Sequence, residues 1–391
     1  MRKEIYYIQI IIFIFLLSFV FQSCTSIDNQ IKKMDLLKPY ENSYFIDVEI
    51  PQSIKILNTT IQRAPKTINE EKYEDKRFYD SESLNPKVIK SLNIDSLKIH
   101  FQLFLPENLS EENKIKGKFL LVHGFAGCSF SFNKLAPLLA DAGFLVVALD
   151  LPNFGYSDRI KIKLNSNCLA DLIYNFLVQF DNQIIAKNNI FQNFNQEVIK
   201  TISKDYPIRW NIVGHSMAGR FITVFSYKYK NIIDSVNLIS PAFFSSKPYS
   251  LFTKLPPFNL FLYLYVSSTL KKENFAKLLE KIYFRKPMDY EVENYLKPLL
   301  IPKTFEYIFY MLDVNEDEEY DPPKLLDKLS FNILLIWGEK DRIVPLKGSI
   351  KLVDKIKEKN LFIIDNAGHN SMETHAEIVF EQIMKHINLS K

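Results

Sequence analysis

Hydrophobic and polar positions follow two different patterns along the chain. In Tyr44–Ile50 and Leu97–Leu105, apolar side chains recur at every second residue, which is typical of half-buried antiparallel strands. Farther along, several short runs are apolar throughout, and segments with a helical period separate many of them: Lys118–Val122, Phe144–Leu149, Trp210–Val213, Val236–Ile239, Ile333–Trp337 and Leu361–Ile364. Buried strands that alternate with helices predict an α/β fold, with a mostly parallel sheet covered by helices on both faces.

Residues 243–325 interrupt this alternation after the run that ends at Ile239. The segment is rich in Phe and Tyr at helical spacing, so we expect a helical lid inserted after the sixth strand. A subdomain whose aromatic side chains only pack against one another is the alternative. The expected organisation is a signal peptide (1–23), a tether (24–42), the first part of the core (43–242), the lid (243–325) and the second part of the core (326–391).

The first residues have the pattern of a targeting segment. A basic start precedes an apolar run that ends at Phe21, and Ser23–Cys24 follows it. This junction resembles a relaxed bacterial lipoprotein box, in which signal peptidase cuts before a cysteine that then carries lipid. We therefore predict an exported protein that is anchored to a membrane through Cys24. An uncleaved helix is the alternative anchor, although Ile5–Phe21 is at the short limit for spanning a bilayer.

Composition narrows the possible functions. The 391 residues contain 49 Lys and Arg against 45 Asp and Glu, interspersed rather than clustered, so we expect no nucleic-acid binding. A hydrophobic content of 47% argues against a disordered chain. The three cysteines are too few for a disulfide framework. We expect Cys128 and Cys168 to be small packing residues, and a single disulfide between them is the alternative.

Ser216 is the first candidate for chemistry. It lies in Gly214-His215-Ser216-Met217-Ala218, directly after an apolar run and before a helical pattern. A sharp turn from strand to helix strains the backbone and brings it close to its neighbours, so small residues are needed on both sides of the serine. The pattern therefore predicts a nucleophile elbow with Ser216 at its tip.

A serine hydroxyl is a weak nucleophile unless a base takes its proton and a third group orients that base. Asp341 and His369 each follow the end of an apolar run, which places them just beyond strand ends. The order serine, acid, histidine fits a catalytic triad with Ser216. Glu339 is the alternative acid. Two other histidines are expected to fix loops through hydrogen bonds, namely His123 and His215.

In this order, the motifs resemble those of the α/β-hydrolase fold superfamily in its lid-bearing branch. The resemblance continues in Leu121–Gly127, a strand end with a His-Gly-Phe loop, and in Asp150–Asp158, close to the family's Asp-x-Pro-Gly-Phe-Gly-x-Ser turn. Two positions depart from the family pattern. Ala218 stands where the elbow usually has its second glycine, and Asn153 replaces glycine in a turn that tolerates asparagine.

The resemblance implies a sheet of the eight-stranded type and a role for each site residue. Ser216 would be the nucleophile, His369 the general base and Asp341 the orienting carboxylate. The backbone N–H groups of Phe125 and Met217 would form the oxyanion hole. Neither a metal nor a cofactor is implied.

A serine at the elbow speaks against the epoxide hydrolases and haloalkane dehalogenases of this superfamily, which use aspartate there. Large aromatic side chains desolvate an apolar group without demanding polar partners. We therefore predict a carboxylesterase or lipase-like serine hydrolase acting on a lipid or a small hydrophobic ester.

Other activities fit the same triad: a proline-iminopeptidase-like peptidase, a thioesterase or acyltransferase, and a C–C bond hydrolase. The peptidase would need a carboxylate in the lid to hold a free amino group. Candidates for that carboxylate are Glu273, Glu280, Asp289, Glu291 and Glu293. The alternative from another class is a non-catalytic surface binding protein on the same scaffold.

Overall fold

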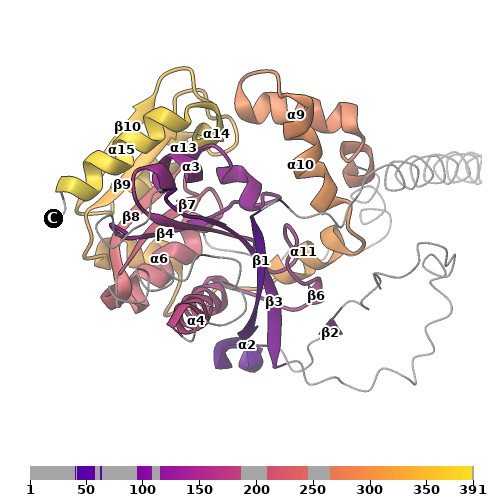
Figure 1. Cartoon of the computed structure of the whole chain (residues 1–391), viewed down its shortest axis with the longest axis horizontal. Coiled ribbons are helices and arrows are strands. Elements are labelled where there is room, and N and C mark those ends of the chain that lie inside the picture. The colour runs from indigo at the N-terminus through magenta and orange to yellow at the C-terminus, as the bar shows by residue number, and fades with distance from the viewer. Residues whose placement is uncertain are drawn as a thin grey trace, which may run out of the picture.

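The structure, a computed structural model, describes residues 40, 42–57, 62–63, 95–107, 115–185, 209–244 and 265–389 (Figure 1). Its main feature is an eight-stranded sheet in the order β1-β3-β5-β4-β7-β8-β9-β10. These strands are β1 (Ser43–Glu49), β3 (Ser96–Phe104), β4 (Lys118–Val122), β5 (Leu145–Leu149), β7 (Trp210–His215), β8 (Ile233–Ile239), β9 (Ile333–Gly338) and β10 (Lys359–Ile364). A separate two-stranded sheet pairs β2 (Gln62–Arg63) with β6 (Ile160–Lys161).

Within the large sheet, β3 runs opposite to the other seven strands. β1 pairs antiparallel with β3, and β3 pairs antiparallel with β5. From β5 to β10, every adjacent pair is parallel. The alternating pattern thus marked the antiparallel strands and the continuous apolar runs marked the parallel ones. The predicted α/β-hydrolase fold class, with its mostly parallel sheet, is confirmed.

Helices cover both faces of this sheet. Side chains of β4 alternate between the two layers, because Leu120 belongs to one buried cluster and Phe119 to the other. The helices of the first layer are α2 (Gln52–Leu57), α4 (Ser166–Ile185), α6 (Ala218–Lys228), α12 (Pro322–Leu325) and α13 (Leu346–Val353). Those of the second layer are α3 (Leu135–Asp141) and α15 (Ala376–Leu389). The shorter elements are α14 (Ser371–Thr374) and the 3₁₀ helices η2 (Ser129–Phe132), η4 (Lys230–Ile232) and η5 (Leu326–Lys328).

Three helices lie in the segment predicted to be a lid, after β8, the sixth strand of the large sheet. They are α9 (Lys272–Tyr283), α10 (Asp289–Leu299) and α11 (Thr304–Leu312), and Figure 1 shows them grouped at one side of the sheet. α9 and α10 share a third hydrophobic cluster, which includes Phe275, Leu279 and Tyr295. Phe130 of η2 belongs to the same cluster, so these helices are packed onto the core.

The structure tests the prediction about the two cysteines but does not reach most of the predicted membrane anchor. Cys128 and Cys168 are buried free thiols in different clusters, so the alternative of a disulfide between them is wrong. The predicted signal peptide, Cys24 and most of the tether lie outside the described residues. Among the helices that are described, none is both long enough and apolar enough to cross a membrane.

Candidate active site

Ser216 lies at the turn between β7 and α6, where the backbone is strained. Its φ is +51°, in the left-handed region that L-residues rarely adopt. Two backbone hydrogen bonds hold the turn. The Ser216 N–H donates to the Ile239 carbonyl at 3.0 Å, and the Ser216 carbonyl accepts the Ala242 N–H at 2.8 Å. A Cβ on Gly124 would lie 2.8 Å from the Ser216 Cβ, so this position needs glycine for the loop after β4 to approach the serine.

The elbow also explains why Ala218 is tolerated. A Cβ on Gly214 would lie 3.4 Å from the Ala218 Cβ and 3.1 Å from side-chain atoms of Ile222 and Leu238. The missing side chain of Gly214 therefore leaves the room that the methyl group of Ala218 needs. The position that needs glycine is instead Gly219, where a Cβ would come within 2.6 Å of Pro241.

Asp341 and His369 meet beyond the ends of β9 and β10. The His369 Nδ1 lies 2.8 Å from Asp341 Oδ2, and both side chains are almost fully buried. The second carboxylate oxygen of Asp341 accepts the backbone N–H groups of Ile343 and Val344, each at 2.9 Å. A carboxylate held at both oxygens fixes the orientation of the imidazole. The other ring nitrogen of His369, Nε2, is left for proton transfer.

Glu339, the alternative acid, points elsewhere. Its carboxylate accepts the Asn366 N–H at 3.1 Å and pairs with Lys340 at 2.9 Å. Both contacts are at the exposed surface. The carboxylate on His369 is therefore that of Asp341.

The other two histidines near the site are structural, as predicted. His123 Nε2 accepts the Leu151 N–H at 3.1 Å, so its proton is on Nδ1 and is donated to the Gly124 carbonyl at 2.7 Å. His215 Nε2 lies 3.1 Å from the His369 carbonyl oxygen and must donate to it. Burial lowers the pKa of both rings, and for His215 the neighbouring His369 adds to this effect. Both are therefore neutral and hold the loops that carry the site.

The predicted oxyanion hole lies beside the elbow. Phe125 follows Gly124 in the loop after β4, and Met217 is the residue just before α6. Among the described residues, no acceptor is bonded to the backbone N–H of either one. The start of α6 also adds the positive end of the helix dipole.

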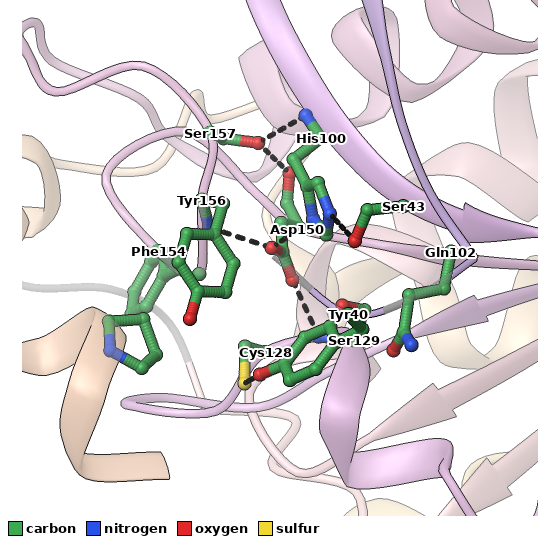
Figure 2. A network of polar contacts seen from close by, with 12 residues as sticks. Tyr40, Ser43, His100, Gln102, Cys128, Ser129, Asp150, Phe154, Tyr156 and Ser157 are labelled. Atoms are coloured by element: carbon green, nitrogen blue, oxygen red, sulfur yellow. Dashed lines mark hydrogen bonds and ion pairs between the residues drawn. The ribbon is translucent and has the colours of Figure 1, made fainter. Parts of the chain in front are cut away.

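A buried polar network fixes the loop that carries Phe125, and Asp150 is at its centre (Figure 2). Its carboxylate accepts the N–H groups of Ser129 and Tyr156, at 2.5 and 2.8 Å, and lies 2.6 Å from His100 Nδ1. His100 Nε2 in turn lies 2.8 Å from the Ser43 hydroxyl on β1. Burial alone would raise the pKa of Asp150, but the His100 ring and these hydrogen bonds lower it to about 2.

The turn after Asp150 contains the second departure from the family pattern. Asn153 has a φ of +69°, and its Oδ1 accepts the Ile160 N–H at 2.7 Å. Its amide nitrogen approaches the Tyr307 carbonyl of α11 at 3.5 Å. Asparagine therefore adopts the conformation of the usual glycine and adds a contact with the inserted helices.

A cavity of about 320 Å³ opens between the elbow and the inserted helices. Ser216 and His369 line it together with Phe125, so the structure gathers most of the predicted site at one cavity. Its apolar lining comes largely from the segment predicted to be a lid: Val266, Leu270, Phe275, Leu278, Leu279, Ile282, Leu299, Phe305 and Phe309. No Lys, Arg, Asp or Glu is among the described residues that line it.

One corner of this cavity is polar, and no sequence pattern predicted it. Ser131, Tyr295 and Asn370 line the cavity, and behind them lies the buried carboxyl of Glu373. Its Oε1 contacts the Tyr295 hydroxyl at 2.5 Å and Asn370 Nδ2 at 2.7 Å, and its Oε2 accepts the Tyr283 hydroxyl at 2.7 Å. Burial raises the pKa of Glu373 to about 7 despite these hydrogen bonds.

None of the acidic residues that a peptidase could use lines the cavity. Glu291 is paired with Arg285 at 2.6 Å, and Glu293 with Lys272 at 2.8 Å. The described part of the cavity therefore presents no carboxylate to a substrate amine.

Comparisons with known proteins agree with this architecture. A family model described as alpha/beta hydrolase fold matches residues 118–376. The chain is 26% identical over 307 residues to the uncharacterized hydrolase YugF of Bacillus subtilis strain 168, covering 77% of this chain and 98% of that protein. It is 24% identical over 260 residues to a 2-hydroxy-6-oxononadienedioate/2-hydroxy-6-oxononatrienedioate hydrolase of Escherichia coli K12, covering 65% and 80%. The solved structure of a bacterial membrane phospholipase A superposes with a TM-score of 0.54 at 20% identity, over 75% of this chain and 84% of that one, a likeness of fold.

Proposed function

This chain belongs to the α/β-hydrolase family, and on that premise we propose that it is a serine hydrolase that cleaves an ester of an apolar acyl or alkyl group. The proposal rests on one observation above all. A strained serine and a histidine held by a buried carboxylate line the same apolar cavity. Ser216 is proposed as nucleophile, His369 as general base and Asp341 as the group that orients it.

The geometry supports a two-step acyl transfer. His369 Nε2 takes the proton of the Ser216 hydroxyl as Oγ attacks the ester carbonyl, and the Phe125 and Met217 N–H groups stabilise the oxyanion. Collapse of this intermediate breaks the bond to the alkoxy oxygen, which leaves with the proton from His369. Water then attacks the acyl-enzyme with His369 again as base, and the acid is released.

The lining of the cavity favours an apolar ester over the substrate named for the Escherichia coli relative. A dienedioate carries two carboxylates, which call for cationic or multiple hydrogen-bonding partners once they are desolvated. No Lys or Arg is among the described lining residues. C–C bond hydrolysis of such a dianion is therefore the weaker candidate for this chain. A peptidase that binds a free amino group is also disfavoured, because the described lining offers no carboxylate.

The decisive experiment measures hydrolysis of p-nitrophenyl esters of increasing acyl length by the wild-type protein and by Ser216→Ala. We expect an optimum at medium or long acyl chains and loss of turnover in the variant. Covalent labelling of Ser216 by a fluorophosphonate separates an enzyme from a binding protein on this scaffold. Ester turnover that persists in Ser216→Ala would show that the assignment of the nucleophile is wrong. Acyl thioesters assayed in parallel test the thioesterase alternative.

We propose further that the enzyme is exported and anchored to a membrane through lipid on Cys24. The proposal rests on the sequence of the first 24 residues, where an apolar run ends in Ser23–Cys24. The described chain begins at Tyr40, whose hydroxyl donates to the Asn294 carbonyl of α10 at 3.2 Å. The tether would therefore join the folded enzyme beside the inserted helices.

A further inference from the structure

The polar corner of the cavity carries an inference that rests on the proposed esterase function. We propose that Ser131, Tyr295 and Asn370 form a subsite that hydrogen-bonds a free hydroxyl group of the substrate. The preferred substrates are then hydroxyl-bearing esters, such as monoesters of glycerol, rather than esters of simple alkyl alcohols. The apolar remainder of the cavity accommodates the acyl chain.

The position of these residues places the subsite next to the reacting centre. Asn370 directly follows His369 in the chain, and both line the cavity. Ser131 lies behind the loop that carries Phe125, because a Cβ on Gly127 would come within 3.2 Å of the Ser131 Oγ. A group bound in this corner would therefore be close to an ester held between Ser216 and the oxyanion hole.

The hydrogen bonds of this corner leave some of its capacity unused. The Tyr295 hydroxyl has one proton but three neighbours: Glu373 Oε1 at 2.5 Å, Ser131 Oγ at 2.8 Å, and Asn370 Nδ2, which donates to it at 3.4 Å. When Glu373 is ionised, Tyr295 donates to the carboxylate and Ser131 donates to Tyr295. The lone pairs of Ser131 Oγ then remain available as acceptors. Asn370 donates an amide proton to Glu373, and the oxygen of the same side-chain amide is a second acceptor.

Protonation of Glu373 reverses the chain of hydrogen bonds. Glu373 then donates to Tyr295, Tyr295 donates to Ser131, and the Ser131 proton is available to a ligand. The charged and titratable groups around Glu373 are Tyr283, Arg285, Glu291, Tyr295 and Cys128. A hydroxyl group both donates and accepts, so it is the simple neutral group that satisfies the corner in either state. A ketone or ether oxygen only accepts.

This corner discriminates between hydroxyl-bearing esters and simple alkyl esters because its polar groups are buried. Ser131 and Tyr295 are 1% and 3% exposed. An alkyl ester that displaces water from them leaves their hydrogen-bonding capacity unmet, which costs binding free energy. A site built to bind a substrate hydroxyl rejects the analogue that lacks it more strongly than an apolar pocket rejects a hydroxyl.

The test compares glycerol 1-monobutyrate with propyl butyrate, which share the acyl chain and the three-carbon alcohol. The measured quantity is the ratio of their kcat/KM values in the full-length protein. We expect the wild-type ratio to favour the glycerol ester, and Ser131→Ala to lower that ratio by about tenfold. Tyr295→Phe, which keeps the aromatic ring in its cluster, should lower it as well.

Ser129→Ala is the matched control, because Ser129 is in the same 3₁₀ helix and is not among the residues that line the cavity. Its hydroxyl has no hydrogen-bond partner within the described structure, so the ratio should stay at the wild-type value. Fluorophosphonate labelling of Ser216 shows that each variant is folded.

Different results overturn the two proposals. A wild-type ratio at or below one, an unchanged ratio in Ser131→Ala, or turnover of neither ester by a protein that labels at Ser216 overturns the subsite. Absence of both labelling and Ser216-dependent turnover overturns the esterase function itself.

Discussion

The backbone N–H of His369 donates a hydrogen bond to the carbonyl oxygen of Ile282 at 2.8 Å. Ile282 is in the last turn of α9, within the segment predicted to be a lid, and His369 is the proposed base. The neighbouring Tyr283 donates to Glu373, four residues beyond His369, at 2.7 Å. The end of α9 therefore supports the loop of the base directly, so displacing α9 would also displace His369.

This contact predicts a strong effect of Gly368→Ala. A Cβ at Gly368 would lie 2.3 Å from the Ile282 carbonyl oxygen and 2.8 Å from the Tyr283 carbonyl carbon, and backbone atoms cannot rotate away. We expect the loop that carries His369 to shift and kcat/KM for esters to fall about 100-fold, which is the scale of a 1 Å misplacement in an active site.

Gly348→Ala is the control for that experiment. Gly348 lies in α13, and a Cβ there meets nothing within 4 Å. Alanine should therefore leave activity unchanged and raise the free energy of unfolding by up to about 1 kcal/mol through its helix propensity. Wild-type activity in a folded Gly368→Ala protein would show that α9 does not position the base.

Asp341→Asn should reduce kcat far more than it reduces stability. The asparagine can keep its carbonyl oxygen on the Ile343 and Val344 N–H groups, and its amide then faces His369 Nδ1. That arrangement favours the tautomer with its proton on Nε2, which cannot accept the serine proton. We expect a loss of about 10⁴-fold in kcat.

Glu339→Gln distinguishes the two candidate acids. Glu339 is exposed and bonded to Asn366 and Lys340, so its amide variant should retain the wild-type rate. Steady-state kinetics of both variants on one ester provide the comparison. A large loss in Glu339→Gln with little loss in Asp341→Asn would reverse the assignment.

The sequence predicted most of the sheet because buried strands must be apolar. The run Lys118–Val122 coincides with β4, whose five residues are all buried. The prediction was short for β10, which begins at Lys359 rather than at Leu361. β10 is an edge strand, so polar residues fit at its start, where Lys359 is half-buried and Asn360 is exposed, and the apolar pattern begins only after them.

The candidate site, too, has one part that the sequence predicted and another that it did not. Strained turns and strand ends restrict residue types locally, so the motifs around Ser216, Asp341 and His369 could be found in the sequence. Ser131, Tyr295 and Glu373 could not be found, because they belong to η2, α10 and α14 and no motif connects them. Only the packing of the inserted helices onto the core brings them together.

Cys24→Ala tests the anchor in a bacterial host. If Cys24 is lipidated, the variant should lose incorporation of labelled fatty acid and keep its signal peptide, because cleavage requires the cysteine. Cys128→Ala is the control, since its buried thiol should not affect processing. A wild-type protein that carries no fatty acid and retains residues 1–23 would instead show an uncleaved helical anchor.

Glu373→Gln tests the buried carboxyl through the pH dependence of stability. The pKa of Glu373 is about 7 in the folded protein, against an ordinary value of 4.5. Between these values the folded state binds more protons than the unfolded state, so this group lowers the free energy of unfolding as pH rises through that window. Above pH 7 its effect is constant.

Glutamine cannot ionise, so the stability of the variant relative to wild type should increase between pH 4.5 and 7.5. A difference in pKa of about 2.5 corresponds to a gain of about 3 kcal/mol. Urea unfolding of both proteins at pH 5 and pH 8 measures this change, and all groups common to the two proteins cancel. A difference that is the same at both pH values would mean that the Glu373 carboxyl titrates as it does in the unfolded chain, and that the Tyr283 and Tyr295 hydroxyls with Asn370 fully offset its burial.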